Sequence, residues 1–138
     1  MSLGRFSYVL VMALWATSAL ASDDFIKGVY VQSEELCANA KESGLDAVLD
    51  EGNVILTARG IEGVEHNCEF LQVLKASRAQ GWIVTALCQE PGHAFPDTLS
   101  ILELSPTQLE MTSVRVPQPD GMPGNDATYY SCEGISPP

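Results

Sequence analysis

Four cysteines, Cys37, Cys68, Cys88 and Cys132, are the residues of this 138-residue chain with the most definite chemistry. In oxidising compartments cysteines form disulfides, whereas elsewhere they more often bind metal ions or react as thiolates. The even number therefore predicts two disulfides if the chain is exported. Four cysteines allow three pairings, and their spacing alone does not choose among them.

Two histidines, His66 and His93, are the other candidates for metal or acid–base chemistry. The patterns His66-x-Cys68 and Cys88-x-Glu90-x-x-His93 each offer two or three ligands, but neither has the paired spacing of a structural zinc site. We therefore expect no metal site and no cofactor. Each histidine lies near a predicted turn, not beside an obvious nucleophile, and no hydrolase or phosphate-binding motif occurs. We expect no catalytic residues and a protein that is not an enzyme.

The N-terminus predicts export. Met1–Arg5 carries one positive charge, Phe6–Ala16 is an apolar run of about 11 residues, and Ala19-Leu20-Ala21 is a small-x-small cleavage site. The run is roughly half of what a membrane-spanning helix needs. We expect a cleaved signal peptide over residues 1–21, a mature chain that begins at Ser22 without a stable membrane anchor, and a periplasmic or secreted location.

The charge of the mature chain restricts its partners. Cleavage removes Arg5, so 7 − 1 = 6 basic residues face 18 acidic ones and the net charge is −12. An acidic surface repels phosphate backbones, so we expect no nucleic acid partner. A cationic protein would instead be attracted, mainly through a faster encounter.

One short helix is predicted near the start of the mature chain. Ser33 suits an N-cap, Glu34 and Glu35 suit the first turn, and Gly44 suits the stop after residue 43. The spacing therefore predicts a helix over residues 34–43.

The rest of the chain reads as short strands linked by tight turns. The segment Pro117–Asp126 holds three prolines and two glycines, so we expect a surface loop there. Such tight connections require antiparallel neighbours. We predict a mainly β (α+β) single domain over residues 22–138, built as a small antiparallel barrel or sandwich. The predicted strands are Gly28–Gln32, Leu45–Leu49, Val54–Ala58, Cys68–Lys75, Gly81–Gln89, Thr98–Leu104, Leu109–Val116 and Ala127–Cys132.

Strand register favours one disulfide pairing. If the turn between two strands centres on Arg78, Cys68 faces Cys88, and Phe70, Gln72 and Leu74 face Ala86, Val84 and Trp82. Side chains alternate with period two, so all of these lie on one face, which is apolar except for Gln72. The register that joins the cysteines also builds a core. We therefore predict Cys68–Cys88, which leaves Cys37–Cys132.

Function is predicted only at the level of binding. The layout is similar to that of small bacterial periplasmic barrels, some of which inhibit lysozymes or proteases. The leading hypothesis is non-enzymatic protein binding, including inhibition of a cationic hydrolase. Tyr129 or Tyr130, whichever faces outward, would contact the partner. The alternative is a small-ligand-binding barrel in which apolar residues such as Leu71 and Leu87 line a cavity.

Overall fold

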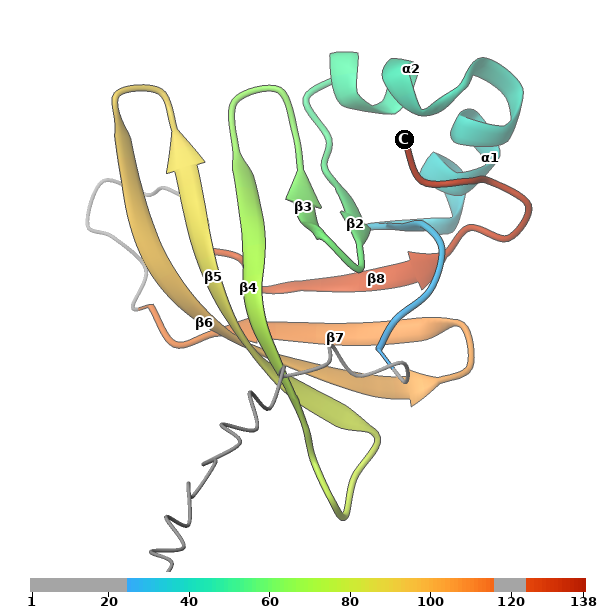
Figure 1. Ribbon diagram of the computed structural model, residues 1–138. Coiled ribbons are helices and arrows are strands. Elements are labelled where there is room, and N and C mark those ends of the chain that lie inside the picture. Colours follow the sequence, from blue (N-terminus) through green and yellow to red (C-terminus); the bar gives the residue numbers. More distant parts are fainter. Residues whose placement is uncertain (1–24, 116–123) are drawn as a thin grey trace, which may run out of the picture.

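The computed structural model describes residues 25–115 and 124–138. Within them, eight antiparallel strands form a closed barrel in which each strand pairs with its neighbours in sequence and β1 pairs with β8 (Figure 1). The mainly β fold is confirmed, and the barrel is selected over the sandwich. The strands are β1 Tyr30–Val31, β2 Ile55–Thr57, β3 Gly60–Glu62, β4 Asn67–Lys75, β5 Gly81–Glu90, β6 His93–Ser105, β7 Gln108–Ser113 and β8 Ala127–Ser131.

The predicted helix forms as α1, Glu34–Ser43, and its cap is the expected one. The Ser33 hydroxyl accepts a hydrogen bond from the backbone N–H of Leu36 at 3.1 Å. Gly44 then adopts a φ of 90°, which an L side chain rarely adopts, and ends the helix.

The prediction of a strand over Leu45–Leu49 is wrong, because this segment belongs to a second helix, α2, Leu45–Asp50. Leu45, Val48 and Leu49 have i, i+3, i+4 spacing and contact the same apolar cluster. In a segment of five residues, this apolar spacing fits a strand and a helix equally well. Packing of the helical face against α1 decides between them.

Two apolar clusters result from the alternation of side chains along the strands. Tyr30 and Leu56 point into the barrel, while their neighbours Val31 and Ile55 point outward beneath α1 and α2. The two helices therefore cover the outer face of β1 and β2, at one side of the barrel (Figure 1). The disulfide Cys37–Cys132 ties α1 to the residue after β8, within this outer cluster.

The predicted register holds from Cys68 to Phe70 and then shifts. Cys68 pairs with Cys88 and Phe70 with Ala86, as expected, and the second disulfide is Cys68–Cys88. A bulge between Phe70 and Gln72 then changes the pairing, so that Gln72 faces Thr85 instead of Val84. An extra residue in one strand reverses which face the later side chains occupy. Gln72, the polar residue on the predicted inner face, is exposed.

Because of the bulge, the predicted pairing of Leu74 with Trp82 is wrong, and Leu74 pairs with Ile83 instead. Both Leu74 and Ile83 are on the outside of the barrel, 55 % and 48 % exposed. Val73 takes the inward position instead and packs against the inner cluster.

Strand β3 was not predicted, and a glycine explains why it forms. A Cβ at Gly60 would lie 1.8 Å from the carbonyl oxygen of Cys68, so only glycine lets β3 approach β4. Strand β6 begins at His93, five residues before its predicted start, and includes Pro96. The predicted signal peptide, residues 1–21, and most of the Pro117–Asp126 loop lie outside the described residues.

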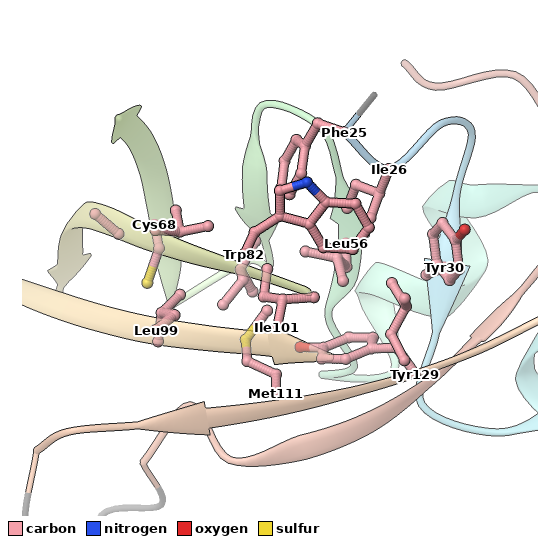
Figure 2. Close-up of a cluster of buried hydrophobic side chains, with 14 of the residues drawn as sticks. Phe25, Ile26, Tyr30, Leu56, Cys68, Trp82, Leu99, Ile101, Met111 and Tyr129 are labelled. Carbon is pink, nitrogen blue, oxygen red and sulfur yellow. The ribbon is translucent and has the colours of Figure 1, made fainter. Parts of the chain in front are cut away.

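One end of the barrel is closed by apolar side chains. Trp82, at the start of β5, is 4 % exposed and meets the ring of Phe25 edge-on, with ring centroids 5.5 Å apart (Figure 2). Ile26 adds to the same cluster. Among the described residues, no helix has both the length and the apolar character needed to cross a membrane.

Candidate functional site

The other end of the barrel, its mouth, is built from the last residues of β5 and the first residues of β6. Pro91 and Gly92 form the turn between these strands, and Gly92 has a φ of 91°. Proline followed by glycine at positive φ is typical of a tight two-residue turn. Glu90 and His93 flank the turn and pair with each other, so the two side chains are held together. Glu90 Oε2 lies 3.6 Å from His93 Nε2.

His66 reaches the same carboxylate from the connection between β3 and β4. The register pairs Asn67 with Gln89, so His66, the residue just before β4, lies opposite Glu90. The distance from His66 Nδ1 to Glu90 Oε1 is 3.1 Å. One carboxylate thus stands between the two histidines of the chain.

Beneath the histidines lies a buried carboxylate, Asp97. It occupies an inward-facing position on β6 and is 3 % exposed. Three donors satisfy it: the Ser113 hydroxyl at 2.8 Å, the Thr98 backbone N–H at 2.8 Å and the Asn125 amide at 2.7 Å. Burial of a charge is tolerated where such hydrogen bonds replace water.

Asn125 connects the buried carboxylate to the histidines. Its Nδ2 donates to Asp97, and its Oδ1 lies 2.7 Å from His66 Nε2. The same amide also lies 3.5 Å from the sulfur of Cys88, so it rests against the disulfide. The result is a continuous chain of hydrogen bonds from Asp97 through Asn125 and His66 to Glu90.

An aromatic ring supports the imidazoles from the side. The Phe95 ring centroid lies 5.5 Å from that of His93 and 6.4 Å from that of His66. The Arg115 guanidinium covers the Phe95 ring, with Cζ 3.7 Å from its centroid.

The mouth opens into a cavity of about 680 Å³. Its lining is mixed, with His66, Glu90, His93 and Asn125 among the polar side chains and Val54 and Ile61 among the apolar ones. The remaining lining residues are Gln32, Gly52, Val54, Ile61, Glu65, Pro91, Gly124, Asp126 and Tyr129.

Two side chains proposed as cavity lining lie elsewhere. Leu71 sits at the bulge and is 59 % exposed. Leu87 lies between the buried residues Ala86 and Cys88 on β5, so alternation directs it to the outer face. The expectation that Leu71 and Leu87 face a cavity is therefore wrong.

The two tyrosines of β8 point to opposite sides, as alternation requires. Tyr129 is inside and 1 % exposed, and burial raises its pKa to about 12, with a side-chain hydrogen bond to Gln32 acting in the opposite direction. Tyr130 is half-buried and faces a shallow depression of about 270 Å³ beside α1. Of the two proposed partner contacts, Tyr130 is the one that a protein partner can reach.

The geometry lacks the pairs that covalent catalysis requires. Among the described residues, neither imidazole bonds to a serine, threonine or free cysteine, and the Ser113 hydroxyl donates to Asp97 instead. His66, Cys68 and Cys88 lie close enough together to suggest metal ligands, but the two sulfurs are joined in a disulfide and offer no thiolate.

Sequence reasoning named Glu90 and His93 in one pattern and His66 in another, but did not bring the two patterns together. The signal was present, because the register that pairs residue 68 with residue 88 also places His66 opposite Glu90. Asp97 was missed, although an acid that alternates with Leu99 and Ile101 on a strand indicates an inward-facing carboxylate. Asn125 lies in the segment predicted as a loop, Pro117–Asp126, and nothing local predicts its position.

Comparison with known proteins finds no matching family model, no similar curated protein and no similar solved structure.

Proposed function

We propose that this protein is an exported binding protein that takes up a small ligand at the mouth of its barrel. The observation that supports this most is the cavity of about 680 Å³ at the mouth. Ligand sites usually occupy roughly 300–1,000 Å³ and combine an apolar wall with a few converging polar groups. A barrel of eight strands is wide enough to hold one small ligand. The two disulfides are compatible with the periplasmic or secreted location proposed for it.

The lining indicates what kind of ligand fits. Glu65, Glu90 and Asp126 contribute carboxylates, and the lining residues include neither lysine nor arginine. Val54 and Ile61 supply apolar surface on the other side. A ligand with an apolar body and a neutral or positively charged polar head suits these walls, whereas an anionic head would meet like charge.

A matched pair of probes tests this proposal. We expect n-butylammonium to shift the NMR signals of the mouth residues more than butyrate at the same concentration. Val54→Trp would fill the cavity and abolish the shifts. Val64→Trp is the control, because Val64 is 67 % exposed and does not line the cavity. Equal binding by the two variants would rule out the mouth as the site.

A second candidate function is protein binding, and an apolar outer wall supports it. Leu74, Ile83 and Leu102 lie on the outer faces of the neighbouring strands β4, β5 and β6, with exposures of 55 %, 48 % and 42 %. Leu102 lies over Gly81, where a Cβ would come within 2.7 Å of its side chain. Apolar patches on the surface of a soluble domain often mark protein contacts.

The charge around this wall differs from that of the whole chain. Residues 70–89 contain no acid, while Lys75 and Arg78 lie near the β4–β5 turn. A cationic hydrolase would therefore be attracted to the acidic rest of the surface and not to this wall. The acidic surface includes the α1 side, where Glu34 and Tyr130 line the same depression. Affinity capture from periplasmic extract by the oxidised protein tests this candidate. Comparison of the proteins captured by the parent, by Ile83→Lys and by Tyr130→Ala shows whether the apolar wall or the α1 side makes the contact. A captured protein that both variants retain equally would contradict both.

A further inference from the structure

The carboxylate of Glu90 lies between two imidazole nitrogens, at 3.1 Å from His66 Nδ1 and 3.6 Å from His93 Nε2. Glu90 and His66 are largely shielded, with side-chain exposures of 16 % and 26 %, while His93 is 53 % exposed. Glu90 and His93 flank one turn and His66 comes from the β3–β4 connection, and the three side chains meet at the barrel mouth. Imidazole and carboxylate together are a donor set that suits zinc and its neighbours in the transition series.

The hydrogen bonds below His66 determine which of its nitrogens has a free lone pair. Asp97 is an acceptor, so the Asn125 amide nitrogen must face it and the Asn125 oxygen must face His66. His66 Nε2 therefore carries a proton and donates it to Asn125. In the neutral ring, Nδ1 then presents a lone pair to Glu90.

Two acceptors 3.1 Å apart need a cation between them. A proton fills that role in an ordinary histidine–carboxylate pair. A metal ion fills it equally well, and metal-binding histidines commonly donate their second ring N–H to a fixed acceptor, as His66 does to Asn125. Donors about 2.0–2.1 Å from a tetrahedral ion lie roughly 3.3 Å apart. The separation of 3.1 Å between His66 Nδ1 and Glu90 Oε1 matches this spacing. His93 Nε2 lies 3.6 Å from the other carboxylate oxygen and must turn toward Oε1 to share the ion, which its exposure of 53 % allows.

We propose that His66 Nδ1, the Glu90 carboxylate and His93 Nε2 bind a divalent transition-metal ion, of which Zn²⁺ is the representative. Phe95 stacks beside both imidazoles, and the Pro91–Gly92 turn holds Glu90 and His93 in register. Three protein ligands would leave one position of a tetrahedral ion for water or another ligand. The proposal does not depend on the small organic ligand, because the metal alone is the probe.

Calorimetric titration of the untagged, oxidised protein with ZnCl₂ tests the site. We expect one saturable site, and at least a tenfold weaker affinity for both Glu90→Gln and His93→Gln. Glu65→Gln is the matched control: it removes a carboxylate from the same cavity and should change the affinity less than twofold. Ca²⁺ should not compete, because it prefers oxygen ligands.

The chain has only two histidines, so imidazole NMR signals give a second readout. Zn²⁺ should shift both sets of ring signals in the parent protein. If Glu90→Gln fails to fold, His93→Gln still decides the question, because the His93 side chain is 53 % exposed and its contacts within the described residues are with the Glu90 carboxylate and the Phe95 ring. Absence of saturable binding, undiminished binding by His93→Gln, or equal loss in Glu65→Gln would overturn the proposal.

Discussion

Strand β5 begins at one end of the barrel with Trp82 and finishes at the other with Glu90, and the two ends use different kinds of side chain. Around Trp82, Phe25 and Ile26 exclude water by apolar contact. Around Glu90, charged and polar side chains contact one another, as Glu90 does with His66 and His93. The first end depends on shape and area, and the second depends on the position of each donor and acceptor.

The difference extends to how polar atoms are treated. Trp82 Nε1 is the buried side-chain polar atom without a hydrogen-bond partner in the described part of the chain. At the mouth, by contrast, the buried atoms of Asp97 and Asn125 are bonded. A single strand therefore passes from an end with an unsatisfied buried donor to an end where the buried Asp97 and Asn125 side chains are hydrogen-bonded. Conservative substitutions should consequently cost less at the first end than at the second.

The largest effect is expected at the closed end. Trp82→Ala removes a ring that is 4 % exposed and should lower the free energy of unfolding by about 3–5 kcal/mol. Trp82→Phe should cost less than about 1.5 kcal/mol, because loss of ring area is offset by removal of the unpaired N–H. Urea unfolding of both variants measures the difference. Equal destabilisation by Phe and Ala would mean that the indole N–H has a partner.

At the mouth, even an isosteric change should be costly. Asp97→Asn replaces an acceptor with a group whose amide must face the Ser113 hydroxyl, the Thr98 N–H or the Asn125 amide. We expect a loss of about 2–3 kcal/mol in the free energy of unfolding, since a buried donor is left unsatisfied. Glu65→Gln, at an exposed acid of the same mouth, is the control and should change stability little. A neutral Asp97→Asn variant would contradict the hydrogen-bond chain.

The sequence was sufficient to predict what depends on local chemistry and strand alternation. Helix α1 follows from Ser33 and Gly44, and both disulfides follow from the register around Cys68. The bulge after Phe70 and the close approach at Gly60 depend on neighbouring strands. Local periodicity does not reveal contacts between strands, so the register after Phe70 and strand β3 were missed.

The candidate site was predictable in part, for the same reason. Glu90 and His93 meet because of a local turn, and His66 joins them through the register already inferred at Cys68. The hydrogen bond from Asn125 to Asp97 joins two residues that are 28 positions apart in sequence. Asp97 is on β6 and Asn125 precedes β8, so this hydrogen bond depends on closure of the barrel. Closure is set by the sum of all strand pairings and not by any one segment.

Tyr129 lies where the inner core meets the floor of the mouth, and its ionisation tests how dry that boundary is. Its pKa is about 12 in the folded chain, above the ordinary tyrosine value of 10.0. Below pH 10 both states are protonated and the stability is fully present. As the pH rises through 10 toward 12, the unfolded state loses its proton first, so stability falls by roughly 1.4 kcal/mol per pH unit, in total about 2–3 kcal/mol.

Comparison of Tyr129→Phe with the parent protein isolates this contribution. The variant should show a smaller loss of unfolding free energy between pH 9 and pH 12, whereas Tyr130→Phe should follow the parent. Burial also raises the pKa of Tyr30, with Glu103 acting in the same direction, so some alkaline loss remains in every variant. An identical pH profile for Tyr129→Phe and the parent would show that solvent reaches the Tyr129 hydroxyl.

The smallest expected effect concerns the aromatic support of the mouth. Arg115 is half-buried and its guanidinium lies 3.7 Å above the Phe95 ring, an arrangement that usually contributes about 0.5–1 kcal/mol. Arg115→Gln should therefore reduce the free energy of unfolding by that amount, and Arg78→Gln, near the opposite β4–β5 turn, should be neutral. Because Phe95 stacks beside both imidazoles, Arg115→Gln should also broaden or shift the His66 and His93 ring signals. A stability loss without any change in those signals would show that Arg115 stabilises its strand end but does not position the two imidazoles.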